Sequence, residues 1–72
     1  MPLIDIQVME GVFSDEEKAC LIRKVTDGFQ EVAGKTLADA TSVRIHEIKS
    51  GSWGYAGQAL TIDDAKAMRA KG

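Results

Sequence analysis

The sequence has few of the residues on which disulfides, metal sites and cofactor sites usually depend. Its 72 residues include one cysteine, one histidine, one tryptophan and one proline. The single cysteine, Cys20, excludes an internal disulfide, and its helical surroundings predict a small buried apolar side chain. The lone histidine, His46, has no second histidine or cysteine at ligand spacing. No metal site is therefore predicted.

The chain also lacks an excess of basic residues and any long apolar run. Its formal net charge is −2, which argues against a nucleic-acid-binding surface. No run of apolar residues approaches the length of about 18 residues that suggests a membrane span. Asp5 and Glu10 interrupt the short apolar start where a signal peptide would lie. We expect a cytoplasmic protein of one small domain, residues 1–72, with no membrane or nucleic-acid partner.

The periodic segments predict an α/β (α+β) fold built on a single β-α-β unit. Alternating apolar residues predict a strand from about Pro2 to Met9 and another over residues 42–49. Between them, Ser14 and Glu17 form the signature of a capping box, and Gly34 ends the helix. The predicted helix has one apolar stripe, made of Leu21, Ile22, Val25, Phe29, Val32 and Ala33. A strand–helix–strand unit of this length is right-handed, with parallel strands.

Three shorter segments complete the expected architecture. Residues 36–41 form a connection with room for one helical turn, and the glycine-rich segment 50–57 predicts a turn or small hairpin. Thr61 begins a short C-terminal helix that runs to about Ala70. Two parallel strands and one amphipathic helix cannot enclose a core, and a domain of this size is marginal alone. We therefore expect other copies of the chain to complete the fold.

The only proline, Pro2, directly follows Met1. Methionine aminopeptidase removes Met before a small residue such as proline, which would leave a free prolyl secondary amine on a strand end. Ordinary α-amines titrate at roughly 7.7–8.0, and an apolar pocket or a nearby cation lowers the pKa of an amine. Such an amine suits general base catalysis at neutral pH. The alternative is that Pro2 merely occupies an N-terminus that needs no amide donor.

Two further residues are candidates for substrate binding. Arg44 lies within a strand of otherwise alternating apolar residues, where a guanidinium can bind a carboxylate or stabilise enolate charge. It can equally form an ion pair at a strand edge or an interface. Trp53, between Ser52 and Gly54, can line an apolar pocket or anchor an oligomer interface. The residues alone leave both pairs of alternatives open.

These features together resemble the 4-oxalocrotonate tautomerase family, the short-chain branch of the tautomerase superfamily. The resemblance covers nearly the whole chain up to about Leu60. The matching segments are Met1-Pro2-Leu3-Ile4, Glu10-Gly11, Ser14-Asp15-Glu16-Glu17-Lys18, Leu21-Ile22-Arg23, Thr41-Ser42-Val43-Arg44 and Trp53-Gly54-Tyr55-Ala56-Gly57.

The resemblance implies a cofactor-independent and metal-independent isomerase. Family members use a free N-terminal proline to move a proton between carbon and oxygen of 2-oxo acids or their enols. Pro2 matches this catalytic proline. Arg44 matches a strand arginine that binds the 2-oxo acid end of the substrate, and Trp53 matches an aromatic residue of the substrate pocket. The resemblance also implies a homohexamer, a trimer of dimers, with active sites formed between subunits.

One departure from the family pattern bears on the substrate. The type enzyme has, directly after the glycine that matches Gly11, an arginine that holds the distal carboxylate of a dicarboxylate. Here Val12 and Phe13 occupy this region. This difference favours a monocarboxylate with an apolar or aromatic tail, such as an arylpyruvate enol.

Two other functions compete with a tautomerase. The first is a relative that acts as a hydratase, dehalogenase or decarboxylase, which needs a charged Pro2 and a carboxylate to direct water. Asp5 and Glu47 are the acids available for that role. The second is a non-catalytic oligomer that binds a small molecule, which retention of Met1 would favour because Pro2 would then be an amide.

Overall fold

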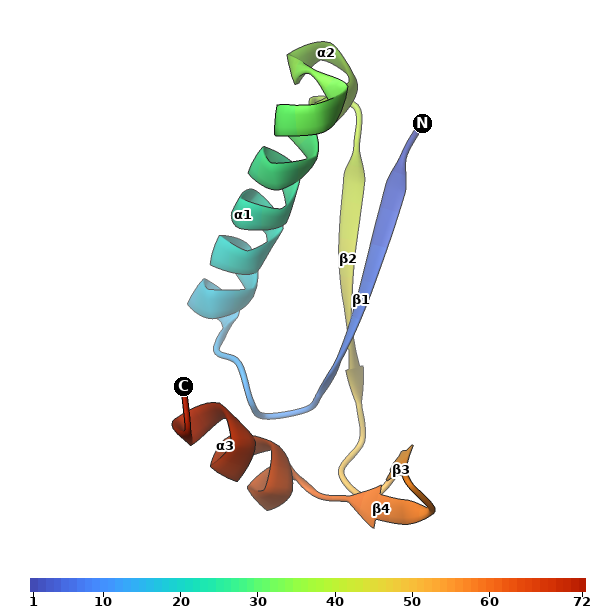
Figure 1. Ribbon diagram of the computed structural model, residues 1–72, viewed down its shortest axis with the longest axis vertical. Helices are drawn as coiled ribbons and strands as arrows, with labels where there is room; N and C mark the ends of the chain where they lie inside the picture. Colours follow the sequence, from blue (N-terminus) through green and yellow to red (C-terminus); the bar gives the residue numbers. More distant parts are fainter. The chain divides into compact units, whose positions relative to one another are not determined.

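The computed structural model describes all 72 residues, Met1–Gly72. Strands β1 (Leu3–Met9) and β2 (Ser42–Ile48) form one two-stranded sheet. They flank helix α1 (Asp15–Ala33) and the short helix α2 (Lys35–Ala38) in sequence. A small second sheet pairs β3 (Trp53–Tyr55) with β4 (Gln58–Leu60), and helix α3 (Ile62–Ala70) follows. The predicted β-α-β fold, with its hairpin and short C-terminal helix, is confirmed (Figure 1).

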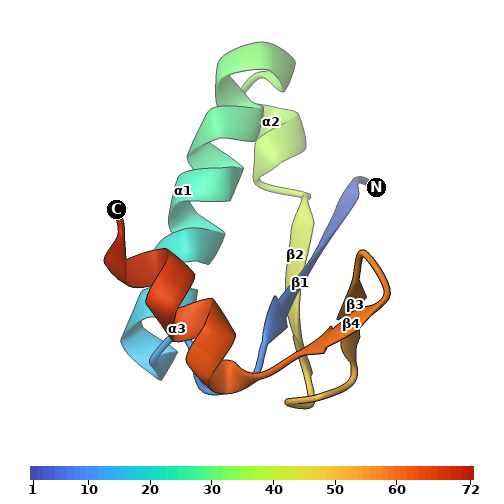
Figure 2. The ribbon, with the colours of Figure 1, turned by 60° about the horizontal axis from the view of Figure 1, so that its bottom comes forward.

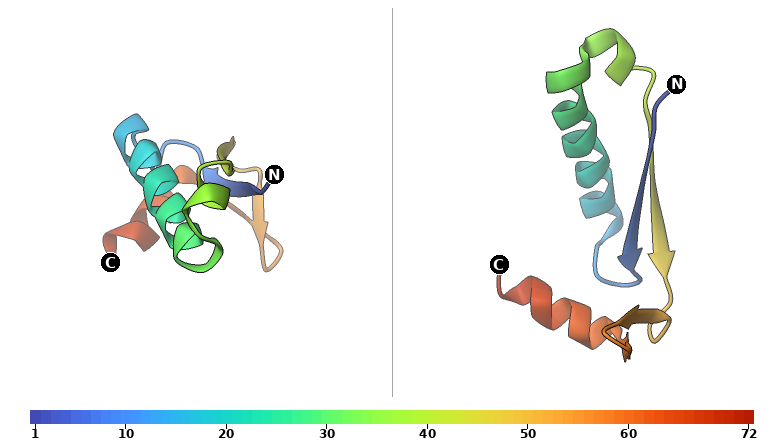
Figure 3. Two further views of the ribbon diagram at one scale, coloured as in Figure 1. Left: turned by 90° about the horizontal axis from the view of Figure 1, so that it is seen from above. Right: turned by 45° about the vertical axis from the view of Figure 1, so that its right-hand side comes forward.

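Strands β1 and β2 run parallel. Near their starts, the Ser42 amide donates to the Pro2 carbonyl over 3.0 Å, and near their ends the Glu10 amide donates to the Ile48 carbonyl over 2.8 Å. The starts of the two strands are therefore paired with each other, and so are their ends. In Figure 3 the blue arrow of β1 and the yellow arrow of β2 point in the same direction. This order is the parallel arrangement that a connecting helix permits.

The residues form two compact units. The first contains residues 1–6 and 14–45, and the second contains residues 7–13 and 46–72. Both strands of the parallel sheet contribute residues to both units. That the 72 residues act as one domain stays a prediction.

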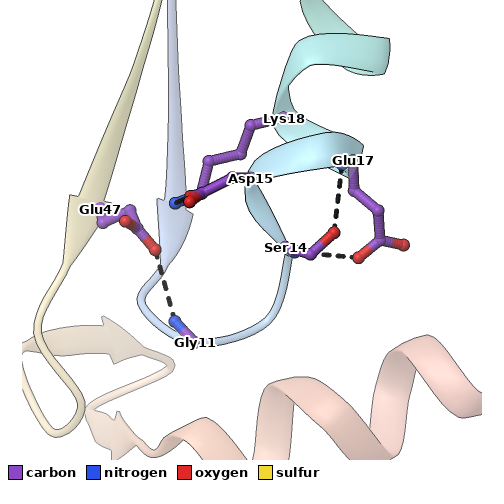
Figure 4. A network of polar contacts seen from close by, with 6 residues as sticks. All are labelled: Gly11, Ser14, Asp15, Glu17, Lys18 and Glu47. Carbon is purple, nitrogen blue, oxygen red and sulfur yellow. Dashed lines mark hydrogen bonds and ion pairs between the residues drawn. The ribbon is translucent and has the colours of Figure 1, made fainter.

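In the first unit, α1 begins as the sequence predicts. The Ser14 side chain accepts from the Glu17 amide over 3.1 Å, and the Glu17 carboxylate accepts from the Ser14 amide over 3.0 Å. Figure 4 shows this reciprocal capping box. The helix ends at Gly34, whose φ of 89° is open to glycine and costly for other residues.

The apolar stripe of α1 is narrower than the sequence indicates. Leu21, Val25 and Phe29, spaced four residues apart, are half-buried. Ile22 is 38% and Val32 93% exposed in the single chain, so the place in the stripe expected for these two residues is wrong for this chain. Because an α-helix has 3.6 residues per turn, residues spaced four apart lie close to one face of the helix. Phe29 and Ala33 share that face, and Val32 lies outside it.

In the second unit, β3 and β4 form an antiparallel hairpin (Figure 2). Trp53 pairs with Leu60 across it, and Tyr55 pairs with Gln58. Ala56 and Gly57 make its two-residue loop, with φ of 50° and 81°, as the tight turns of hairpins require. Helix α3 starts with a second capping box, between Thr61 and Asp64. None of the helices has the length and apolar character needed to cross a membrane.

Few side chains are buried within one chain. Only Met9 and Ala38 fall in the buried apolar class, and no large side chain is fully buried. The exposed large apolar side chains are Met1, Leu3, Ile22, Val32, Leu37, Tyr55 and Met68. A chain with so little interior fits the expectation that further copies cover part of its surface.

Candidate functional site

Pro2 lies at the start of the parallel sheet in the first unit. Its carbonyl accepts a 3.0 Å hydrogen bond from the Ser42 amide, which fixes the backbone at this end of the strand. Pro2 is half-buried, whereas Met1 before it is 91% exposed. With Met1 attached, the Pro2 nitrogen is an amide. Once an aminopeptidase removed the exposed Met1, the secondary amine would stand on a hydrogen-bonded strand end.

Arg44 belongs to the same unit, two residues beyond Ser42 in β2. Its neighbours Val43 and Ile45 are half-buried, while Arg44 is exposed. Successive side chains of a strand point to opposite faces, so Arg44 points away from the face of Val43 and Ile45. A guanidinium here is open to an anion or to another subunit. The role of Arg44 in substrate binding stays a prediction.

Trp53 lines a pocket of about 270 Å³ in the second unit. The walls come from the end of β1, the connection after it, the hairpin and α3. The lining residues are Val8, Met9, Val12, Phe13, Trp53, Leu60, Ala65, Met68 and Arg69. Trp53 and Leu60 are direct partners across the hairpin, so their side chains share one face. Trp53 thus lies in the wall of a pocket within the single chain, and its role in substrate binding stays a prediction.

The pocket contains one charged residue that the sequence analysis missed, Arg69 on α3. Its Nη1 donates a 2.8 Å hydrogen bond to the Val12 carbonyl. The guanidinium also lies over the Phe13 ring, with Cζ 4.6 Å from the ring centroid, within the range of a cation–π interaction. Residues 57 positions apart meet here, and no local pattern around Arg69 signals this contact.

Backbone hydrogen bonds to two carboxylates hold the walls of the pocket. A Glu10 oxygen accepts from the Ser50 amide over 2.9 Å. A Glu47 oxygen accepts from the Gly11 amide over 3.4 Å, the bond drawn in Figure 4. The Ser50 hydroxyl in turn accepts from the Ile62 amide at the start of α3, over 3.0 Å. These bonds link the end of β1, the segment before the hairpin and the start of α3. They give the pocket a fixed backbone frame.

Gly11 has a further reason to be glycine. Its φ is 77°, and a Cβ there would lie 3.5 Å from the Ile62 side chain. The contact is ordinary, so the positive φ rather than crowding excludes a larger residue. The Glu10-Gly11 pair noted in the sequence thus closes β1 and orients the connection that carries Val12 and Phe13.

No group of three or more His, Cys, Asp or Glu side chains is arranged to hold a metal ion. His46 is an exposed residue of β2, and Cys20 is a half-buried residue of α1 with a free thiol.

Comparison with known proteins agrees with these features. The family model described as "Tautomerase enzyme" matches residues 2–62, beginning at Pro2 and ending at the first residue of α3. The 2-hydroxymuconate tautomerase of Comamonas testosteroni is 39% identical over 57 residues, which cover 79% of this chain and 87% of that protein.

Solved structures give the same fold. YwhB, a homologue of 4-oxalocrotonate tautomerase, superposes with a TM-score of 0.73 at 30% identity, covering 82% of this chain and 93% of that one. TomN, a 4-oxalocrotonate tautomerase homologue in the tomaymycin biosynthetic pathway, superposes with a TM-score of 0.73 at 27% identity. That match covers 99% of this chain and 97% of TomN.

Proposed function

Because the chain belongs to the tautomerase family and is an isomerase, we propose that its mature form uses Pro2 as both general base and general acid. The reaction is a keto–enol or double-bond isomerisation of a 2-oxo acid. The observation that carries the proposal is the position of Pro2. It directly follows Met1, begins the segment that matches the family model, and is held at the sheet by the bond from Ser42.

The proposed reaction moves one proton and adds or removes no other atom. The unprotonated Pro2 nitrogen takes the proton from the enol hydroxyl of the substrate. The C–O bond gains double-bond character, the carbon–carbon double bond moves or is lost, and the Pro2 ammonium returns the proton to carbon. A single group that accepts and then donates needs a pKa near the working pH. An apolar pocket lowers the pKa of an amine toward that range.

In this proposal, Arg44 binds the 2-oxo acid end of the substrate. A guanidinium pairs with a carboxylate through two parallel hydrogen bonds and stabilises negative charge that develops on the enolate oxygen. Its exposure on β2 supports this role, because the group is accessible to an anion. Trp53 supports the substrate body, since it lines the apolar pocket.

The active form in this proposal is a homohexamer in the cytoplasm, a trimer of dimers whose active sites lie between subunits. The shortage of buried side chains in one chain supports assembly. The aliphatic Val12, where the type enzyme has an arginine, favours a monocarboxylate with an apolar tail. The apolar lining of the pocket supports such a tail.

A test of the proposal combines mass and activity. Intact mass spectrometry should show the loss of one methionine, and the mature chain should ketonise 2-hydroxymuconate or an arylpyruvate enol. Pro2→Ala should lower kcat by roughly 100-fold or more, the usual scale of general acid–base catalysis. A Pro2→Ala protein with wild-type activity would rule out the role of Pro2, and an active chain that retained Met1 would do the same.

A further inference from the structure

The pocket of the second unit has room for one small ring. Its volume is about 270 Å³, and an apolar cavity of about 150 Å³ is enough to bind benzene. Trp53 and Phe13, two of the lining residues, are only half-buried. Aromatic side chains favour offset or edge-to-face contacts with a second ring. The walls therefore suit a small aromatic molecule with little polar surface.

The one charged residue of the pocket is engaged by the chain itself. Eight of the nine lining residues are uncharged, and the ninth is Arg69. Its guanidinium donates to the Val12 carbonyl and lies over the Phe13 ring, and Arg69 has a further interaction besides these two. Because this cation already has partners in the chain, a ligand need not carry a negative charge to occupy the pocket. We expect an uncharged ligand, in keeping with the rest of the lining.

Arg69 holds the part of the wall that carries Val12 and Phe13. These two residues belong to the connection between β1 and α1, outside the helices and strands, where a backbone is usually more mobile than in regular structure. The 2.8 Å bond from Arg69 fixes the Val12 carbonyl, and the cation–π contact fixes the Phe13 ring. Both side chains thus face the pocket in an arrangement that depends on Arg69.

This support comes from α3, and the family match ends at the first residue of that helix. The same helix also contributes Ala65 and Met68 to the lining. One wall of the pocket, and the residue that orients another, are therefore supplied by a part of the chain beyond the matched segment.

We propose that the pocket binds a small uncharged aromatic molecule, and that Arg69 is the positioning residue that holds Val12 and Phe13 in the shape this ligand requires. All the lining residues belong to the second unit, so the proposal is independent of Pro2 and of the reaction assigned to it. Arg69 acts through the wall that it supports, and it does not pair with a charge on the ligand.

Binding can be measured without turnover, because Trp53 is the only tryptophan and its fluorescence reports on the pocket. The probes are benzyl alcohol, an uncharged single ring, and benzoate, its anionic counterpart. The mature wild-type protein should bind benzyl alcohol with a saturable change in fluorescence, and more tightly than benzoate. No saturable binding of benzyl alcohol, or tighter binding of benzoate, would overturn the proposal. This comparison needs no variant, so it holds even where a substitution prevents folding.

The variant Arg69→Met tests the positioning role. It leaves every lining residue uncharged with a side chain of similar reach, so a pocket that needed only apolar walls would bind benzyl alcohol at least as tightly as before. We expect binding at least fivefold weaker. Arg69→Lys keeps a cation and a donor and should weaken binding less. Lys66→Met removes a charge from an exposed residue of the same helix that does not line the pocket, and it should bind normally.

A double-mutant cycle distinguishes positioning from a general loss of stability. Residues that act through one another have non-additive effects. Arg69→Met should therefore weaken binding of benzyl alcohol only about twofold when Phe13→Leu is already present. Equal fold-changes with and without Phe13→Leu would reject the positioning role.

The same titration tests whether a second copy of the chain occupies the pocket. It is carried out at two protein concentrations, and the affinity for benzyl alcohol should be the same at both. An affinity that fell as the protein concentration rose would show that another copy covers the pocket, and the site for a small molecule would be rejected.

Discussion

Arg69 and Val12 are joined by a 2.8 Å hydrogen bond from the guanidinium to the backbone carbonyl. The bond links the last turn of α3 to the connection after β1. The same guanidinium lies over the ring of the neighbouring Phe13. Both sides of the contact line the same pocket. One residue thus closes a wall of the pocket and gives it charge.

The contacts of Arg69 with Val12 and Phe13 should stabilise the folded protein. Arg69→Ala removes a charge-assisted hydrogen bond and a cation–π contact, both at an exposed side chain. We expect a loss of about 1 kcal/mol in the free energy of unfolding. Urea unfolding at fixed protein concentration measures it, with Lys66→Ala as the matched control. Equal stability of the two variants would mean that the contact contributes nothing in solution.

The capping box of α1 predicts a second loss. Ser14→Ala leaves the Glu17 amide without its side-chain acceptor, which should cost about 1 kcal/mol. Ser52→Ala makes the same chemical change at an exposed residue outside the helices, and it should stay within about 0.5 kcal/mol of the wild type. Thermal or urea unfolding of both variants distinguishes capping from a general loss of a hydroxyl.

The conformation of the hairpin loop predicts a substitution that should raise the stability of the protein. Ala56 has φ of 50°, a conformation that costs an ordinary residue roughly 1 kcal/mol and that asparagine tolerates. Ala56→Asn would create the Asn-Gly pair that favours such turns, and we expect about 0.5 kcal/mol of added stability. Ala59→Asn within β4 should instead destabilise, because asparagine is disfavoured in strands. A loss of stability in Ala56→Asn would contradict this account of the turn.

The proposed base predicts the direction of pH dependence. Only the unprotonated Pro2 amine can accept a proton, so kcat/KM for ketonisation should rise with pH and level off above the pKa of that amine. Below that pKa the rate should fall about tenfold per pH unit. A rate that increased toward low pH would point instead to a charged proline, as in the hydratase or decarboxylase alternative.

The small interior predicts that folding depends on assembly. Sedimentation should give a mass several times that of the 7.8 kDa chain, and the urea midpoint should rise with protein concentration because association stabilises the folded form. A folded monomer with a midpoint independent of concentration would contradict both the expected assembly and an active site shared between subunits.

The sequence alone was enough to predict the local elements. Ser14 with Glu17 and Thr61 with Asp64 mark the two capped helix starts, and Gly34 marks the end of α1. Such signals lie within a few residues of the atoms that they bond. For the same reason, the strands β1 and β2 follow from alternation, with ends within one residue of those observed. The family, too, is evident from Pro2 and the motifs that follow it.

Only the tertiary structure decided which distant residues meet. Val32 fits the periodicity of α1 and is nevertheless exposed, because burial depends on what packs against the helix. Arg69 reaches Val12, and the Gly11 amide reaches Glu47, across 57 and 36 positions of the chain. No periodicity encodes such pairings, since they arise from how the strands, hairpin and α3 fold back on one another. The candidate base could therefore be found in the sequence, and the charge of the pocket could not.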